Sequence, residues 1–339
     1  MITPPRDAES SSASADLPLA VGPAITIAAP SFGAGPKLAG CGAGDDMGLV
    51  MTLLAPAGNS AALSAVAGEL ARDLAAKIVW LAAGEACDLL PLGPLEAEAA
   101  AVTARRRIGG APIDVVVQPM AGRRKRLLVA DMESTMIENE MLDELADFVG
   151  QRTEVAEITR RAMNGELDFV AALTARVGLL TGLPASVLAE AAARIRPMPG
   201  AHALIATMRR DGVATALVSG GFTAFANPVA AALGFDRVVA NHLDLVAGKI
   251  AGRVRPPIVT RETKRDTLRA LAAEYRLAPA QTMAVGDGAN DLPLLAEAGI
   301  GIAYRAKPAV AAAARWRIDH ADLTALLYIQ GYRREEIAG

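Results

Sequence analysis

Hydrophobic and polar residues follow two different patterns along this chain of 339 residues. Between residues 48 and 118, short apolar runs typical of strands alternate with two segments that have the apolar spacing of amphipathic helices. The predicted elements follow in the order β-α-β-β-α-β, which is the order of ferredoxin-like domains. Small regulatory domains that bind amino acids share this order with many unrelated domains. We therefore expect an α+β domain over residues 46–122.

From residue 127 onwards, short and continuously apolar runs alternate with helical segments. The runs LLVA, VATALVS, QTMAVGD and GIGIAY are typical of parallel strands that are covered on both faces. We expect a parallel α/β core built from residues 123–137 and 198–339. Residues 138–197 show helical signals only, which predicts a helical insert that caps the carboxyl end of the first core strand.

The remaining segments and the composition exclude several kinds of protein. Residues 1–45 are rich in Ser, Ala, Pro and Gly and are predicted to form a disordered tail. The basic run GRRKR (122–126) is expected to be a solvated junction between domains. A formal charge of −3 argues against a nucleic-acid-binding protein, and no apolar run is long enough for a membrane span. Two distant cysteines, Cys41 and Cys87, fit a reducing compartment, so we expect a cytoplasmic protein.

Acidic residues follow two of the predicted core strands. Asp131 and Glu133 come after LLVA, and Asp287 and Asp291 come after QTMAVG. Ligands bind at the carboxyl ends of strands in open α/β sheets, so the four carboxyl groups would share one pocket if the strands are neighbours. Two charges 4 Å apart repel by about 4 kcal/mol at an effective dielectric constant of 20. Such a cluster needs a cation, and oxygen ligands favour Mg²⁺. Each acid taken singly could instead be a turn or capping residue.

Two further motifs suit phosphate chemistry. VATALVS delivers Ser219, followed by Gly220 and Gly221 and a predicted helix; a hydroxyl and backbone N–H groups at that place can bind phosphate oxygens. A serine nucleophile elbow would need glycine where Leu217 stands. Lys264 lies in the segment VTRETKRD of a chain that otherwise prefers arginine, which hints at a need for a compact ammonium group. A plain strand-to-helix turn and a solvated lysine are the alternative interpretations.

Together the motifs DMEST (131–135), SGG (219–221), Lys264 and GDGANDLPLL (286–295) resemble the haloacid dehalogenase-like (HAD) phosphatase superfamily. Within it, NGELDF (164–169), RVGLL (176–180) and Glu140 are similar to the phosphoserine phosphatase family. The resemblance covers residues 127–329. It implies a Rossmann-like parallel core, a helical cap over residues 138–197 and, from longer family members, an ACT-like regulatory domain over residues 46–122. It also implies Mg²⁺-dependent hydrolysis of O-phosphoserine to serine and phosphate.

The resemblance also implies roles for single residues. Asp131 would attack phosphorus and form an aspartyl-phosphate, and Glu133 would act as general acid and base. The Mg²⁺ ligands would be Asp131, Asp287 and the backbone carbonyl of Glu133, with Asp291 in support. Ser219, Gly220, Lys264 and Asn290 would contact or neutralise the phosphoryl group. In the cap, Glu140 would bind the substrate ammonium and Arg176 its carboxylate, while Met163 and Phe169 would close the apolar side of the pocket.

One residue departs from the family pattern, which usually has Asp where this chain has Glu133. The side chain is one methylene longer, so its carboxyl group must fold back to reach the same point. This leaves room for other small phosphomonoesters, such as phosphohomoserine or phosphocholine, or for phosphotransfer. A catalytically silent amino-acid sensor is the alternative from another class. We further expect a homodimer formed through the N-terminal domain, which could bind an amino-acid effector such as serine.

Overall fold

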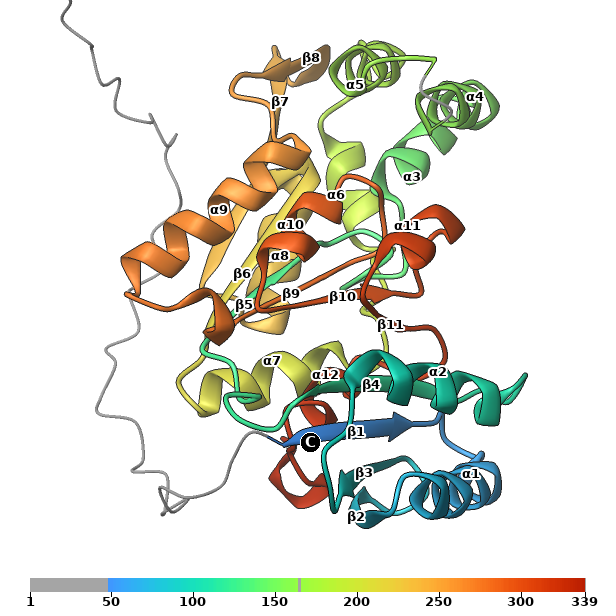
Figure 1. Cartoon of the computed structure of the whole chain (residues 1–339). Helices are drawn as coiled ribbons and strands as arrows, with labels where there is room; N and C mark the ends of the chain where they lie inside the picture. Colours follow the sequence, from blue (N-terminus) through green and yellow to red (C-terminus); the bar gives the residue numbers. More distant parts are fainter. Residues whose placement is uncertain (1–47, 164–165, 339) are drawn as a thin grey trace, which may run out of the picture.

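The computed structural model describes residues 48–163 and 166–338, which form a lower lobe and a larger upper lobe (Figure 1). The predicted tail over residues 1–45 lies outside the described residues. So do residues 164–165 of the cap motif and Cys41.

The lower lobe is a four-stranded sheet with two helices on one face. Its strands are β1 (Leu49–Leu54), β2 (Ala76–Ala82), β3 (Ala86–Pro91) and β4 (Asp114–Pro119), and its helices are α1 (Ser60–Asp73) and α2 (Ala97–Ile108). The strands lie in the order β2-β3-β1-β4, and every neighbouring pair is antiparallel. The predicted β-α-β-β-α-β order is therefore present, while the assignment as an ACT-like domain stays a prediction.

The upper lobe contains a seven-stranded sheet in the order β11-β10-β9-β5-β6-β7-β8. Its strands are β5 (Leu127–Ala130), β6 (Ala214–Phe222), β7 (Arg237–Val246), β8 (Lys249–Arg255), β9 (Thr282–Gly286), β10 (Ile300–Tyr304) and β11 (Trp316–Ile318). The helices that follow or precede them are α7 (Ala201–Arg210), α8 (Thr223–Leu233), α9 (Arg261–Glu274), α10 (Leu292–Glu297), α11 (Pro308–Ala313) and α12 (Ala325–Tyr328).

The central strand β5 shows why its sequence is continuously apolar. It pairs in parallel with β6 on one side and β9 on the other. Leu127 and Val129 pack into the core on one face of the sheet, and Leu128 and Ala130 pack into the core on the other face. Because both faces are covered, alternation with polar residues is lost, and the carboxyl ends of β5 and β9 meet at one edge. The predicted parallel α/β core is confirmed.

A β-hairpin at the sheet edge was not predicted from the sequence. β7 and β8 pair antiparallel through a two-residue turn in which both Ala247 and Gly248 have positive φ angles, 50° and 75°. Such turns fit the twist of a hairpin, but the usual Asn-Gly or Asp-Gly signal is replaced by Ala-Gly. The hairpin rises beside the cap helix α5 (Figure 1).

In the sequence, the cap comes between β5 and α7. It contains α3 (Met141–Asp147), α4 (Arg152–Met163), α5 (Phe169–Gly178) and α6 (Ser186–Ala192). In Figure 1 its helices α4 and α5 lie at the top of the upper lobe. Its two connections to the core run side by side: Glu138 N–H donates to Arg196 O, and Met198 N–H donates to Met136 O, both at 2.9 Å. The described part of residues 138–197 is thus helical, as predicted, and joined to the core by a paired stem.

The second face of the lower sheet packs on the upper lobe, so that Leu54 and Val116 share a core with α12. Asp114, at the start of β4, accepts hydrogen bonds from three consecutive backbone N–H groups at residues 319–321, at 2.8, 3.0 and 2.9 Å. Trp316 Nε1 donates to Val117 O at 2.9 Å. The two lobes are therefore joined by buried apolar contacts and by directional hydrogen bonds.

The run GRRKR lies in this junction, and the prediction of a solvated linker is wrong for its middle residues. Arg123 forms an ion pair of 2.7 Å with the buried Asp88 of β3. The Arg124 guanidinium stacks over the ring of Tyr332, 3.4 Å from its centroid. Lys125 is buried, and its ammonium donates to two backbone carbonyls. Arg123 thus links the junction to the lower sheet, while Arg124 and Lys125 attach it to Tyr332 and to the carbonyl of Ala280.

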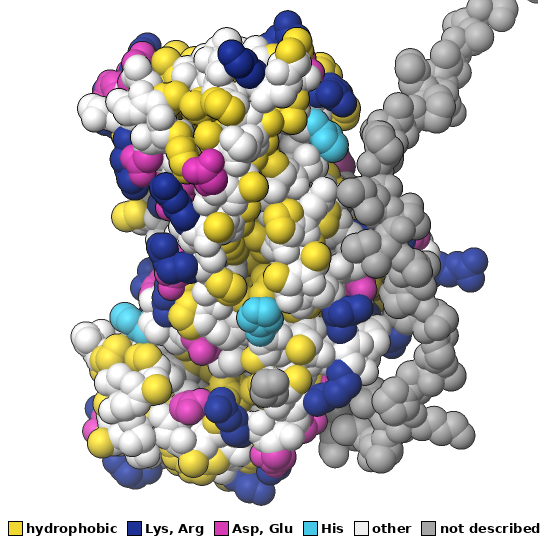
Figure 2. Space-filling model, turned by 180° about the vertical axis from the view of Figure 1, so that it is seen from behind, with side chains coloured by type: hydrophobic (Ala, Val, Ile, Leu, Met, Phe, Trp, Pro, Cys, Tyr) yellow, Lys and Arg dark blue, Asp and Glu magenta, His cyan; other side chains and the backbone are white. Residues whose placement is uncertain are grey.

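The remaining surface and burial features agree with the composition. On the face shown in Figure 2, Lys and Arg side chains are scattered among acidic and apolar ones. Among the described residues, none of the helices combines the length and the apolarity needed to cross a bilayer.

Cys87 is buried, and burial raises the pKa of its thiol to about 12. A thiol that stays protonated at neutral pH is a poor nucleophile, so Cys87 is a core residue.

Replacing Asp114 by alanine should destabilise the junction, because three backbone N–H groups would lose their shared acceptor. We expect a loss of at least about 2 kcal/mol in the free energy of unfolding, measured by urea titration with the intrinsic fluorescence of Trp80 and Trp316. The control is Asp319→Ala in the same loop, which removes only an ion pair with the exposed Arg317 and should cost less than about 0.5 kcal/mol. Equal losses in both variants would contradict this account of Asp114.

Candidate active site

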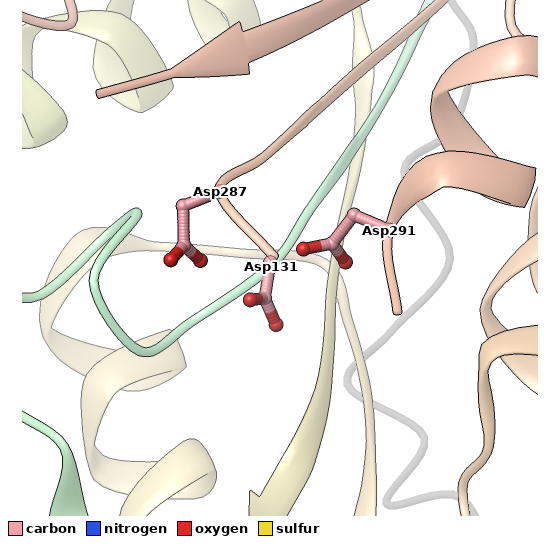
Figure 3. Close-up of side chains that lie close together, drawn as sticks. All are labelled: Asp131, Asp287 and Asp291. Atoms are coloured by element: carbon pink, nitrogen blue, oxygen red, sulfur yellow. The ribbon is translucent and has the colours of Figure 1, made fainter. Parts of the chain in front are cut away.

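Three buried carboxyl groups meet at the carboxyl edge of the sheet. Asp131 follows β5, Asp287 follows β9, and Asp291 stands at the start of α10. One carboxylate oxygen from each lies within 4.8 Å of the others, and Figure 3 shows the three carboxyl groups gathered in one place. The structure therefore brings together the acids from two distant sequence motifs, as their positions after neighbouring strands predicted.

Lys264 supplies a buried positive charge to this cluster. Its ammonium donates to Asp131 Oδ1 and to Asp291 Oδ1, both at 2.6 Å, and its side chain is 1% exposed. The residue lies in the first turn of α9, where the Thr260 side chain caps the helix. Burial alone would lower the pKa of Lys264, but the two carboxylates raise it above its usual value. Lys264 therefore stays charged.

One ammonium does not balance three carboxyl groups. Burial and repulsion from Asp291 raise the pKa of Asp131 to about 8, although Lys264 opposes this shift. Burial raises the pKa of Asp287 to about 6. The charge of the half-exposed Lys307, whose Nζ lies 3.7 Å from Asp287 Oδ2, opposes this shift. The excess of acidic oxygens is what a hard divalent cation requires. The donor set fits such an ion, with Asp131 and Asp287 as ligands and Asp291 beside them.

The glycines of GDGAND provide the space that the acids occupy. A Cβ atom at Gly286 would overlap the carboxyl group of Asp291. The N–H group of Gly288 donates to Asp291 Oδ2 at 3.0 Å, and the Asn290 side chain lies beside the same glycine. The close approach of side chain to backbone explains why this loop needs glycine at both positions.

The Ser219–Gly221 loop forms another wall of the site. Ser219 is buried within β6, and its Oγ accepts a hydrogen bond from Gly221 N–H at 2.9 Å. The ring of Phe169, the first residue of α5, lies over Gly220, 3.6 Å from where a Cβ atom would stand. The cap residue Phe169 thus lies close to Gly220 of the predicted phosphate-binding loop.

The Glu133 carboxyl group lies between the start of α3 and Gly221. Its Oε1 accepts a hydrogen bond from Met141 N–H at 2.9 Å, at the start of α3. Its carboxyl group lies against Gly221, where a Cβ atom would come within 2.9 Å of Glu133 Oε2. Burial and the nearby Glu140 raise the pKa of Glu133 to about 8. At neutral pH the group can therefore carry a proton and give it away.

The cap segment places a carboxylate and a guanidinium close enough to interact with the charges of the site. Glu140, an exposed residue before α3, accepts a hydrogen bond of 2.7 Å from Ser134 Oγ. Arg176 on α5 is held by hydrogen bonds to Ala172 O (3.3 Å) and to Thr159 Oγ1 on α4 (3.2 Å). Burial lowers the pKa of Arg176, while nearby carboxylates partly offset this. Met163 ends α4, but its side chain lies outside the described part of the structure.

Sequence reasoning missed several residues at the site. Asp143 on α3 is an acid whose charge interacts with both Glu140 and Arg176. Thr135 Oγ1 lies 3.5 Å from Asp287 Oδ1. Lys307 follows β10 at the same sheet edge as Asp287, so the rule that located the aspartates would also have found it.

The arrangement suits transfer of a phosphoryl group. A buried carboxylate held by an ammonium can serve as a nucleophile, the acidic cluster can hold a cation that neutralises anionic oxygens, and a second carboxyl group with a raised pKa can move a proton.

Comparison with known proteins gives matching results. The sequence profile of the haloacid dehalogenase-like hydrolases matches residues 128–296. A phosphoserine phosphatase of Mycobacterium tuberculosis is 42% identical over 248 residues, which are 73% of this chain and 59% of the relative. One of Streptococcus thermophilus is 45% identical over 205 residues, which are 60% of this chain and 95% of the relative. This chain thus matches about three fifths of the mycobacterial protein and nearly all of the streptococcal one.

Solved structures show the same likeness. A probable phosphoserine phosphatase from Vibrio cholerae, in unliganded form, has a TM-score of 0.68 at 32% identity and covers 84% of this chain and 86% of its own. A phosphoserine phosphatase solved as an analogue of its phospho-aspartyl intermediate has a TM-score of 0.57 at 37% identity, covering 60% of this chain and 98% of its own.

The acidic cluster predicts a measurable cation site. Asp287→Asn should weaken Mg²⁺ binding at least about tenfold, because a neutral amide oxygen replaces a charged ligand; calorimetry with MgCl₂ measures the affinity. Asp266→Asn, an exposed acid that pairs with arginines on α9, is the control and should bind Mg²⁺ as the wild type does. An unchanged affinity in Asp287→Asn would rule out this residue as a ligand.

Proposed function

This chain belongs to the phosphoserine phosphatase family of haloacid dehalogenase-like hydrolases, and we propose that it hydrolyses O-phospho-L-serine to L-serine and phosphate. The reaction would require Mg²⁺ and complete the synthesis of serine. The observation that carries the proposal is the buried contact of Lys264 with Asp131 and Asp291 beside Asp287. Of the alternatives, a silent amino-acid sensor gives no reason to keep this charge cluster buried.

Asp131 would react as a carboxylate because Lys264 and a bound cation would offset the burial and repulsion that raise its pKa. In the first half-reaction, an oxygen of this carboxylate attacks phosphorus and the bond from phosphorus to the serine oxygen breaks. The leaving oxygen takes the proton of Glu133, whose raised pKa keeps it protonated at neutral pH. Lys264 neutralises charge on Asp131 and on the phosphoryl oxygens, while Ser219 and Gly220 donate hydrogen bonds to those oxygens. The product on the enzyme is an aspartyl-phosphate.

In the second half-reaction, Glu133 is ionised and takes a proton from a water molecule. That water attacks phosphorus, the bond to Asp131 breaks and phosphate leaves. Covalent catalysis divides one very slow hydrolysis into two faster steps. The hydrogen bond from Met141 N–H keeps the Glu133 carboxyl group aimed at the same place for both steps.

The residues that would hold Mg²⁺ are Asp131, Asp287 and the backbone carbonyl of Glu133, supported by Asp291 and by Asn290. When bound, the ion would neutralise negative charge on the phosphoryl oxygens. The ligands that this chain offers are all oxygen atoms. The positive charge of Lys264 is already paired with Asp131 and Asp291.

Selection of the serine portion would depend on the cap. Arg176 can grip a carboxylate with two parallel hydrogen bonds, and Glu140 would pair with the ammonium group. The hydrogen bond from Ser134 to Glu140 joins the nucleophile loop to that recognition site. Phe169 and Met163 would close the pocket on its apolar side.

The direct test is phosphate release from O-phospho-L-serine with Mg²⁺. In Arg176→Ala we expect the KM for this substrate to rise at least about tenfold, while hydrolysis of p-nitrophenyl phosphate, which lacks a carboxylate, is preserved. Arg160→Ala is the control, because this cap arginine makes an exposed pair with Glu157. A preference for phosphohomoserine or phosphocholine would favour those substrates instead. No release from any of these compounds would exclude a phosphatase.

For residues 46–122 we propose an ACT-like regulatory domain that binds an amino-acid effector such as serine and forms a homodimer. The likeness to the Vibrio cholerae structure supports this, since it covers 84% of the chain. In the described sheet, β2 is an edge strand with Trp80 39% exposed, and a free edge can pair with a second copy. The proposal also includes a catalytic core at 123–137 and 198–339, a cap at 138–197 and a cytoplasmic location.

The effector test must separate this domain from the active site, where serine would also bind. Titration of serine into Arg176→Ala, which lacks the proposed carboxylate receptor, should still release heat with micromolar to millimolar affinity. Sedimentation of the same sample should show the mass of two chains. Absence of heat would end the effector proposal, and a monomer would end the dimer proposal.

A further inference from the structure

We infer that Asn241 is a positioning residue that holds the Ser219–Gly221 loop and the start of α9 at the spacing required to bind a phosphoryl group. The inference rests on the proposed function and deepens it, because Asn241 itself is not expected to touch the substrate. Asn241 lies on β7 and is fully buried.

A single side-chain amide joins the two segments. Asn241 Nδ2 donates to Gly220 O at 2.7 Å, and Asn241 Oδ1 accepts from Val259 N–H at 2.8 Å. Gly220 belongs to the predicted phosphate-binding loop. Val259 directly precedes Thr260, the residue that caps α9, and α9 carries Lys264. Both elements that would contact the phosphoryl group are therefore tied to one rigid group.

The strand pairing explains why a side chain is needed here. Val218 pairs with Val239 and Phe222 with Asn241, so five residues of β6 span the same length as three residues of β7. Ser219, Gly220 and Gly221 therefore lie opposite Ala240 alone, and this bulge interrupts the ladder of backbone hydrogen bonds. Asn241 provides a hydrogen-bond partner for the Gly220 carbonyl inside that bulge.

The chemistry of the two contacts requires an amide. The Gly220 carbonyl needs a donor and the Val259 N–H group needs an acceptor, and Asn offers both on one planar group. Aspartate has the same shape but would place an acceptor against a carbonyl oxygen. Because the site is buried, water cannot replace the lost donor without a structural shift. The Gly220–Gly221 peptide would then be free to rotate, and Gly221 N–H would lose its alignment with Ser219 Oγ.

A change in this spacing should affect phosphate more than serine. The phosphate contacts lie on the bulge and on α9, whereas the proposed serine contacts, Glu140 and Arg176, lie at the cap. A loss of general stability would weaken both ligands together. The ratio of the two affinities therefore distinguishes a positioning role from a merely structural one.

The experiment compares Asn241→Asp with the wild-type full-length chain in the presence of Mg²⁺. Calorimetry measures the affinity for inorganic phosphate, and kinetics give the inhibition constant for serine. We expect the phosphate affinity to fall at least about tenfold, kcat/KM for O-phosphoserine to fall with it, and the serine constant to change less than about twofold. Asn241→Ser, which adds no charge, should also lose affinity for phosphate more than for serine. This variant replaces Asn241→Asp in the experiment if Asn241→Asp fails to fold.

Gln330→Glu is the matched control. Gln330 is also a buried amide that bridges two segments, accepting from Lys125 N–H at 2.9 Å and donating to Leu326 O at 2.8 Å, but it lies in the junction between the lobes. It should leave phosphate affinity unchanged. Unchanged phosphate affinity in folded Asn241 variants, or equal losses for phosphate and serine, would overturn the inference. If the wild type binds phosphate and hydrolyses p-nitrophenyl phosphate but not O-phosphoserine, the proposed substrate fails while the inference stands.

Discussion

The buried ammonium of Lys264, held between Asp131 and Asp291, is the interaction on which the rest of the site depends. Three carboxyl groups at the edge of an apolar sheet repel one another and lose solvation, and the raised pKa values of Asp131 and Asp287 are the physical sign of that cost. Lys264 connects β5, α9 and α10 through two short hydrogen bonds. It lowers the cost of gathering the acids but leaves enough negative charge for a divalent cation.

The backbone around this cluster is shaped by the same crowding. Gly286 lies where a side chain would overlap Asp291, and Gly221 lies where one would press on Glu133. Glutamate at position 133 is accommodated because its carboxyl group turns toward the start of α3 and accepts a hydrogen bond there. The proposed acid and base is thus attached to the cap, so the cap position and the proton-transfer geometry are physically connected.

The lower lobe is part of the same packed structure rather than a loosely tethered neighbour. Its sheet is covered by α1 and α2 on one face and by the upper lobe on the other. Asp114 accepts hydrogen bonds from the loop that follows β11, and β11 pairs with β10. Lys307, which follows β10 in the sequence, donates its backbone N–H to Asp287 O at 3.2 Å. Only two strands separate the junction from an acidic residue of the site.

The amino-acid sequence specified the helices and strands that have strong periodicity, the parallel core, and the position of Asp131 and Asp287 directly after two core strands. The adjacency of β5 and β9, which brings these two acids together, came from the tertiary structure. The sequence did not reveal the hairpin of β7 and β8, whose turn lacks the usual residues, or the burial of Lys125 and the ion pair of Arg123 with Asp88. These features depend on the tertiary structure, since a polar side chain is buried or exposed according to partners that are distant in sequence: Asp88 for Arg123, and the backbone of Gly220 and Val259 for Asn241. Local patterns specify elements, whereas long-range packing specifies which polar groups find each other.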